Sequence, residues 1–176
     1  MSLRIVELVN SIKPVSYLEL GYWDGANHKA VDCPDKVSVD TNGKAIFTGT
    51  TDEFFAQNKR RFDVTFIDAC HCIDFVKRDW NNAIACTDHA IILHDMIPPT
   101  RRHCAKAECS DSYLLLNHFI DRGIEYRSLD HDCGLTVMLA KDFETATDEV
   151  GFISYYEFME KVRTCTLEEL KQYARK

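Results

Sequence analysis

Residue types that bind cations or move protons follow the apolar runs of this sequence. Carboxylates, glycines and imidazoles stand directly after these runs, at Glu19–Gly25, Asp40, Gly49–Asp52, Asp68–His71 and His94–Asp95. Glycine lets a ligand approach the backbone closely, and carboxylates attract a positively charged ligand. A histidine, with an ordinary pKa near 6.5, can accept a proton at neutral pH when a carboxylate orients its ring. The pattern indicates a site for a cationic ligand with acid–base groups beside it.

These side chains need a scaffold that brings the ends of the apolar runs together. Apolar runs predict strands over residues 15–20, 36–39, 45–48, 62–67, 90–93, 124–129 and 135–139. Helical spacing and capping residues predict helices over residues 3–12, 26–33, 51–58, 75–84 and 113–119, with two short ones after residue 154. Strands that alternate with helices predict an α/β fold with a doubly wound, mostly parallel sheet, and the pair at 124–139 predicts one antiparallel edge strand. In such a sheet, ligands bind beyond the carboxyl ends of the strands, where the residues above would stand.

The composition argues against several classes of protein. The chain has 176 residues, of which 45% are hydrophobic and 28% charged, and its formal net charge is −7. Basic residues cluster only at 59–61 and 101–102, without the basic stripe typical of nucleic-acid binding. No apolar run approaches the roughly 20 residues that span a bilayer, and residues 3–12 resemble an amphipathic helix rather than a signal peptide. We expect a cytoplasmic protein that binds neither nucleic acid nor membranes.

Eight cysteines raise the question of disulfides or a structural metal. They stand at positions 33, 70, 72, 86, 104, 109, 133 and 165. No C-x-x-C pair occurs among them, and structural zinc sites usually show short, recurring ligand spacings. Nothing marks the chain as secreted, so free thiols are favoured over both alternatives.

The glycine turn after the first strand indicates a nucleoside without phosphates. Gly21 and Gly25 are spaced G-x-x-x-G, which is not the dinucleotide fingerprint G-x-G-x-x-G, and no Walker lysine follows. Asp40, at the end of the second strand, stands where a ribose-binding carboxylate would, although Asp-Thr-Asn-Gly is also good turn chemistry. A cationic adenosine derivative would suit a glycine turn ringed by acids.

These segments together resemble a known family. LELGYWDGAN (18–27) looks like motif I of the class I S-adenosylmethionine-dependent methyltransferases, and the similarity continues in order through KVSVD, TTDEFF, FDVTFIDACH, IILHDMIPP and HDCGLTVML. The chain looks most like the small branch with an F-D-x-x-F-I-D-G-x-H segment and a later H-D, often associated with sugar and small-molecule modification. The resemblance implies a Rossmann-like methyltransferase domain over residues 1–141, with residues 142–176 as a helical C-terminal appendage of it.

The resemblance also assigns roles to single residues. Binding of S-adenosylmethionine is implied for Glu19, Gly21, Tyr22, Gly25, Asp40, Thr51, Asp52 and Asp68. Catalysis is implied for His71, His94 and Asp95, with either histidine as general base and a carboxylate as its orienting partner. Simpler interpretations stay open, because Asp68 and Asp95 could cap the segments that follow and both histidines could make only structural hydrogen bonds.

A divalent cation is possible in this family but disfavoured here. Some related enzymes hold one with acids that correspond to Asp68 and Asp95. Met96 follows where an oxygen ligand often stands, and a thioether is a poor partner for magnesium.

The sequence predicts a methyltransferase that acts on a hydroxyl of a sugar or other small-molecule acceptor. Two alternatives remain: a catalytically inactive protein that binds S-adenosylmethionine or S-adenosylhomocysteine, and an interaction scaffold. The pattern specifies neither the acceptor nor the oligomeric state.

Overall fold

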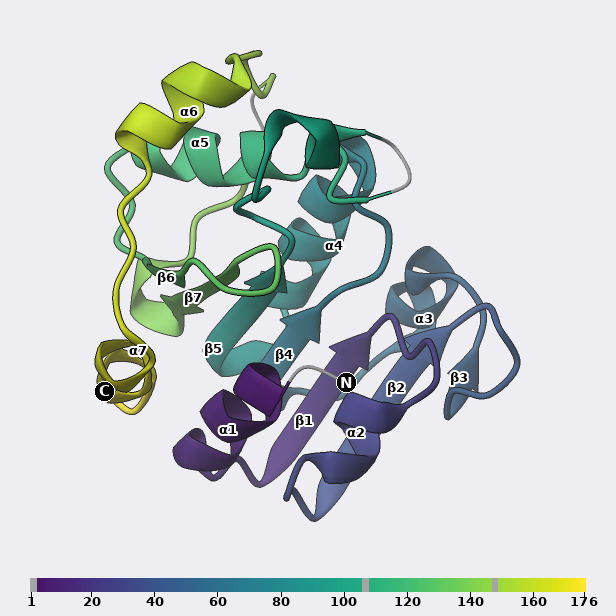
Figure 1. Ribbon diagram of the computed structural model, residues 1–176. Helices are drawn as coiled ribbons and strands as arrows, with labels where there is room; N and C mark the ends of the chain where they lie inside the picture. The colour runs from purple at the N-terminus through teal and green to yellow at the C-terminus, as the bar shows by residue number, and fades with distance from the viewer. Residues whose placement is uncertain (1–2, 106–107, 147–148) are drawn as a thin grey trace.

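The computed structural model describes residues 3–105, 108–146 and 149–176, and these form one mixed sheet covered by helices on both faces (Figure 1). The strand order is β3-β2-β1-β4-β5-β7-β6. The strands are β1 (Ser16–Leu20), β2 (Asp35–Asp40), β3 (Phe47–Thr48), β4 (Phe62–Ile67), β5 (Thr87–His94), β6 (Arg127–Leu129) and β7 (Leu135–Leu139). The helices are α1 (Leu3–Ile12), α2 (Ala26–Ala30), α3 (Thr51–Gln57), α4 (Ile73–Ile84), α5 (Tyr113–Asp121), α6 (Tyr155–Lys161) and α7 (Leu167–Ala174), with short 3₁₀ helices η1 (Arg101–Cys104) and η2 (Ala140–Asp142).

The predicted fold class is confirmed. Strands β3, β2, β1, β4 and β5 pair in parallel, and β7 pairs antiparallel with both β5 and β6. The antiparallel strand lies one position in from the edge, because the short β6 occupies the edge itself. Strand β5 begins three residues earlier than the apolar run at 90–93, since it starts with the polar residues Thr87, Asp88 and His89.

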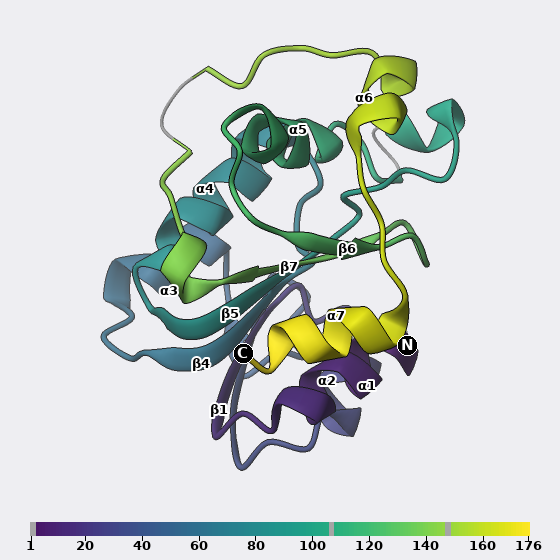
Figure 2. The same ribbon diagram turned by 90° about the vertical axis from the view of Figure 1, so that its left-hand side faces the viewer.

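Two hydrophobic layers explain why the central strands are continuous apolar runs. Helices α1, α2 and α7 cover one face, and α3, α4, α5 and α6 cover the other (Figure 2). Alternate side chains of one strand enter opposite layers: Phe66 of β4 belongs to the first and Ile67 to the second. Strands that are buried on both sides cannot alternate apolar with polar residues, so their sequence shows unbroken runs.

The segment after residue 141 contributes to both layers. Phe158 of α6 is fully buried and its ring centroid lies 5.1 Å from that of Tyr113. Leu170 and Ala174 of α7 are fully buried on the opposite face, where α7 packs beside α1 (Figure 2). No helix in the described part of the chain combines the length and apolar character that crossing a bilayer requires.

The order of the strands creates the place for a ligand. From β1 the chain passes to β2 on one side of the sheet, and later to β4 on the other side. Loops that leave β1 and β4 therefore diverge, and they leave a crevice at the carboxyl ends of these strands.

Candidate active site

The crevice consists of two cavities that share a wall. The first, of about 420 Å³, lies between the ends of β2 and β4 and helices α3 and α4. The second, of about 280 Å³, lies on the other side of β1 and reaches His94 at the end of β5. Gly21, Trp23 and Asp68 line both. A long ligand could thus extend from one cavity into the other past Gly21 and Asp68.

The structure brings most of the predicted site residues to these cavities. The first cavity is lined by Gly21, Asp40, Thr51, Asp52 and Asp68 among the residues that the sequence singles out. The second is lined by Glu19, Gly21, Tyr22, Asp68 and His94 from the same set. Sequence reasoning gave no site role to other lining residues, among them Trp23, Phe75, Arg78, Asp79 and Asp132.

Gly21 is required by the close approach of two strand ends. Its φ is +93°, and a Cβ atom there would lie 2.0 Å from the carbonyl oxygen of Asp68. Gly25 has a φ of +73°, and a Cβ at that position would overlap the ring of Tyr22. Both glycines therefore permit backbone positions that a side chain would exclude.

Asp40 is engaged by its own loop. The backbone N–H groups of Tyr22 and Trp23 each donate to Asp40 Oδ2 at 2.9 Å, and that of Asn42 donates to Oδ1 at 2.9 Å. The side chain of Asn42 in turn donates to the Trp23 carbonyl at 2.7 Å. A carboxylate has about four lone-pair sites, so these three bonds leave about one for a ligand.

Two other predicted cofactor contacts also have partners within the protein. Glu19 is 1% exposed and accepts a hydrogen bond from the Tyr17 hydroxyl at 2.9 Å. Asp52 Oδ1 lies 2.7 Å from Nε of Arg78, in an ion pair whose side chains are about half exposed.

Asp79 is a buried acid with an orphaned oxygen in the wall of the first cavity. It is 1% exposed, and its Oδ1 has no hydrogen-bond partner among the described residues. Burial raises its pKa to about 6. The sequence carried a signal for it, because Asp79 shares the buried face of α4 with Val76, Trp80 and Ala83, where an acid is unusual.

Asp68, His71, His94 and Asp95 form a carboxylate–imidazole cluster at the ends of β4 and β5. His71 Nε2 lies 2.9 Å from Asp95 Oδ2 and 3.4 Å from Asp68 Oδ1. His94 Nδ1 lies 3.2 Å from Asp68 Oδ1 and 3.3 Å from Asp95 Oδ2. Each carboxylate thus contacts both imidazoles.

The two histidines differ in whether a ring nitrogen remains free to contact a substrate. His71 Nδ1 donates to the carbonyl oxygen of Glu108 at 2.7 Å, so both of its ring nitrogens are engaged. His94 Nε2 is buried and has no hydrogen-bond partner among the described residues, although Asp132 Oδ2 lies 3.9 Å away. The His94 side chain also lines the second cavity. Only His94 therefore offers a ring nitrogen to a bound molecule.

The charges of the cluster correct one expectation about its histidines. Hydrogen bonds to Asp68 and Asp95 raise the pKa of His71 to about 11, against the effect of burial. Burial works to lower the pKa of His94, but the same two carboxylates raise it well above the usual value. The pKa values of both imidazoles therefore lie above the ordinary value near 6.5 that the sequence suggested. The reason is that each faces two carboxylates rather than one.

Comparisons with known proteins identify the fold. No family model matches the chain, and neither does any curated protein. Among solved structures, an O-methyltransferase from Bacillus cereus in complex with SAH aligns with a TM-score of 0.58 at 12% identity, over 77% of this chain and 78% of that one. The chain has the methyltransferase fold.

Two further solved structures extend the comparison. Cofactor-bound Rv0187 from MTB aligns with a TM-score of 0.64 at 14% identity, over 81% of this chain and 82% of that one. The SAH-bound Podospora anserina methyltransferase PaMTH1 aligns with a TM-score of 0.56 at 15% identity, over 76% and 74% of the two chains. At such low identity, the methyltransferase fold is what these proteins share, and residue roles must come from the geometry of this site.

Proposed function

We propose that this chain binds S-adenosylmethionine across the two cavities and transfers its methyl group to a hydroxyl of a sugar or other small molecule. The observation that carries the proposal is the shared wall at Gly21 and Asp68, with an acid–base cluster at the far end. Bound there, the sulfonium cofactor supplies an electrophilic methyl group. The chain then has to position both molecules and accept one proton.

The first cavity suits the adenosine part. Asp79 Oδ1 is a buried acceptor without a donor, and the exocyclic amine of adenine is the donor it lacks. We assign this contact to Asp79, with Thr51 and Asp52 lining the same cavity, because Asp52 is already paired with Arg78. Asp40 fixes the loop beneath the ribose and has capacity left for about one ribose hydroxyl.

The second cavity suits the methionine part and the acceptor. The carboxylates of Glu19 and Asp68 line it and attract an ammonium group. The neutral form of His94, which becomes more abundant as pH rises, is the proton acceptor in this proposal through Nε2, with Nδ1 oriented by Asp68 and Asp95. His71 has no free ring nitrogen, so it positions Asp95. No hard cation enters the proposal, since Met96 is fully buried in the core and supplies no oxygen donor beside Asp95.

Isotope transfer tests the proposal. Purified protein with labelled S-adenosylmethionine and a panel of sugars and small alcohols is expected to yield a labelled ether. His94→Gln should lower kcat by about 10²–10⁴-fold while S-adenosylhomocysteine still binds. The exposed His131, changed to Gln, serves as the matched control and should leave kcat unchanged. Binding without transfer to any acceptor would contradict the catalytic assignment.

Calorimetry tests the adenosine contact separately. Asp79→Asn removes the buried charge and keeps the shape of the side chain, so affinity for S-adenosylhomocysteine should fall about 10–100-fold. Asp74→Asn, at an exposed position of the same helix, is the matched control. Equal affinities of both variants would place the adenine elsewhere.

A second candidate is a non-catalytic protein that binds the same nucleoside. It is favoured by the raised pKa of both histidines, because a ring that stays in the imidazolium form cannot accept a proton. The two candidates differ in pH dependence. A catalyst should turn over faster as pH rises toward the pKa of its histidine base, whereas a binder shows no turnover at any pH. Absence of heat with either nucleoside would favour an interaction scaffold.

A further inference from the structure

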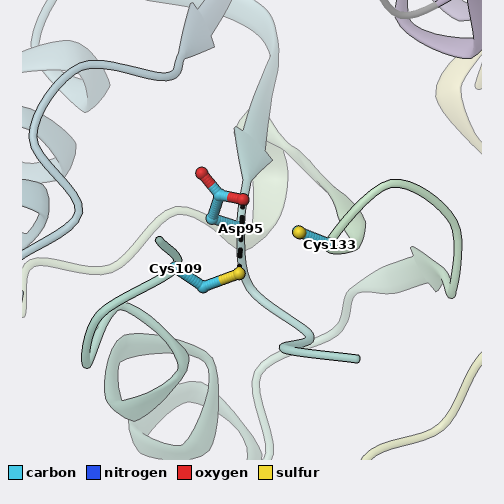
Figure 3. Close-up of side chains that lie close together, drawn as sticks. All are labelled: Asp95, Cys109 and Cys133. Atoms are coloured by element: carbon cyan, nitrogen blue, oxygen red, sulfur yellow. Dashed lines mark hydrogen bonds between the residues drawn. The ribbon is translucent and has the colours of Figure 1, made fainter. Parts of the chain in front are cut away.

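Three donor side chains meet on the far side of Asp95 from the histidines. Asp95 follows β5, Cys109 precedes α5, and Cys133 lies in the turn between β6 and β7 (Figure 3). One donor atom of each lies within 4.8 Å of the other two. The residues come from three separate segments, so tertiary folding alone brings them together.

The two edges of the Asp95 carboxylate serve different neighbours. Oδ2 lies 2.9 Å from His71 Nε2 and faces the catalytic side. Oδ1 accepts a hydrogen bond from the Cys109 thiol at 3.5 Å (Figure 3). The sulfur cluster (Asp95, Cys109 and Cys133) therefore shares one carboxylate with the proposed active site and is otherwise distinct from it.

The sulfur cluster is sheltered from water. Cys109 is 1% exposed, Asp95 is 5% exposed, and Cys133 is half-buried. Both cysteines are free thiols in the structure, and their sulfur atoms turn toward each other and toward Asp95 (Figure 3). The upper limit of 4.8 Å on the separation of the two sulfur atoms includes the distance of about 3.8 Å between two sulfurs bound tetrahedrally to one zinc ion at about 2.3 Å.

Neighbouring contacts hold the three segments in place. The Ser112 hydroxyl contacts the Asp95 carbonyl oxygen at 2.6 Å and that of Cys109 at 2.8 Å. The backbone N–H of Ile97 donates to the Cys133 carbonyl at 2.9 Å. The donors are thus fixed by the surrounding backbone, as preorganised metal sites require.

We propose that Asp95 Oδ1, Cys109 Sγ and Cys133 Sγ bind one zinc ion or a similar soft divalent cation, with water as the fourth ligand; both cysteines bind as thiolates and release their protons to solvent as the metal enters. Two sulfur donors select such an ion over magnesium or calcium, which prefer oxygen. The ion ties the segment before α5 and the β6–β7 turn to the end of β5. Because its three ligands are distant in sequence, the short spacings that reveal most zinc sites are missing.

Cobalt titration of the full, reduced chain tests this site. One equivalent of Co²⁺ should give a thiolate charge-transfer band and tetrahedral d–d bands, and zinc should displace it. Cys109→Ser and Cys133→Ser should each weaken the charge-transfer band and lower cobalt affinity at least about tenfold. The matched controls Cys86→Ser, at a buried thiol, and Cys165→Ser, at a half-buried one, should retain the full spectrum. The readout involves no methyl transfer, so its result is independent of the proposed enzymatic function.

Three results would overturn the site. The first is a wild-type spectrum without a thiolate band, and the second is a thiolate band that survives both substitutions. The third is a Cys109–Cys133 disulfide in the mass spectrum of protein purified without reductant, together with no bound metal. If Cys109→Ser fails to fold, as judged by circular dichroism, the loss or retention of the thiolate band in Cys133→Ser decides whether the site exists, because Cys133 is only half-buried. Alkylation gives a second measurement, since zinc should slow modification of Cys133 but not of Cys165.

Discussion

At the end of β2 the Asp40 carboxylate is held by backbone N–H groups, whereas at the ends of β4 and β5 Asp68 and Asp95 are held by two imidazoles. We call the first the amide-held region (Tyr22, Trp23, Asp40 and Asn42) and the second the imidazole-held region (the carboxylate–imidazole cluster). Backbone amides do not titrate, but imidazoles do. The amide-held region should therefore keep its geometry across the physiological pH range and above it, while the charge of the imidazole-held region should change once pH approaches the raised pKa values of its histidines.

This contrast divides the proposed work between the two regions. In the proposed function, cofactor binding needs a fixed shape, and the amide-held region would provide it through backbone N–H donors that keep their protons. Proton transfer needs a group that can change charge, and the imidazole-held region provides it. The two meet at Gly21, whose N–H donates to the Val39 carbonyl at 2.9 Å and whose Cα faces Asp68.

Gly21→Ala should have the largest effect, because it disrupts both regions at once. The new Cβ would lie 2.0 Å from the Asp68 oxygen, at a φ of +93°. Overpacking and left-handed strain together should cost about 3–5 kcal/mol of unfolding free energy. Gly43→Ala is the matched control, because Gly43 has a φ of +76° with nothing within 4 Å of the added atom. Urea denaturation that gives equal losses for both variants would contradict the close approach.

Asp68→Asn should make the imidazole-held region titrate within the neutral range. The Asp68 hydrogen bond is the largest contribution that raises the pKa of His71 to about 11, so removing the charge should bring that pKa down. In NMR titrations, the ring signals of His71 and His94 should stay constant from about pH 6 to 9 in the wild type and move in the variant.

The same substitution has a consequence for stability, with a defined sign. A histidine whose folded pKa is raised contributes stability below its unfolded pKa, and this contribution disappears as pH rises through the folded value. The contribution of His71 should be complete below about pH 6.5, decline steadily above it and be exhausted near pH 11, whereas in Asp68→Asn the contribution should be smaller and should be exhausted at lower pH. Asp132→Asn is the control, since Asp132 is half exposed and lies 3.9 Å from His94.

Asp40→Asn should reduce stability by an amount that does not depend on pH. The amide oxygen cannot replace both carboxylate oxygens, so at least one backbone N–H loses its acceptor, at about 1–3 kcal/mol. Thermal melts at about pH 6 and pH 9 should show the same difference from the wild type. Asp24→Asn, where the side chain accepts from Ala26 N at an exposed position, should change stability less. A strongly pH-dependent difference at Asp40 would break the contrast between the two regions.

Asp52→Asn should have the smallest effect. Its ion pair with Arg78 has both side chains about half exposed, and such pairs contribute about 0–1 kcal/mol. High salt should abolish the difference in melting temperature between variant and wild type, because screening weakens the wild-type pair. A loss well above this range would show that Asp52 stabilises the wall of the first cavity by more than its charge.

The apolar runs in the sequence were sufficient to predict the sheet and the positions at the strand ends that line the site. Strands β4 and β7 have the predicted boundaries, because residues buried on both sides form unbroken apolar runs. The positions directly after β1, β2, β4 and β5 lie at one edge for the same topological reason.

The internal partners of the site could not be predicted in this way. The carbonyl that holds His71 belongs to Glu108, which lies in an irregular segment with no repeating pattern. The shifted pKa values depend on how many carboxylates face one ring, and that number is set by packing. Asp79 is the exception, since an acid on the apolar face of α4 was visible in the sequence and was overlooked.

The position of Trp23 has an optical consequence. The chain has two tryptophans: Trp23 is 83% exposed and lines both cavities, whereas Trp80 is fully buried and donates to the Glu144 carbonyl at 2.8 Å. Acrylamide should therefore quench the fluorescence of the first indole and leave that of the second. A molecule that fills either cavity should shield the Trp23 indole from acrylamide. The extent of quenching therefore reports whether the cavities are occupied, and the buried Trp80 supplies a constant reference signal.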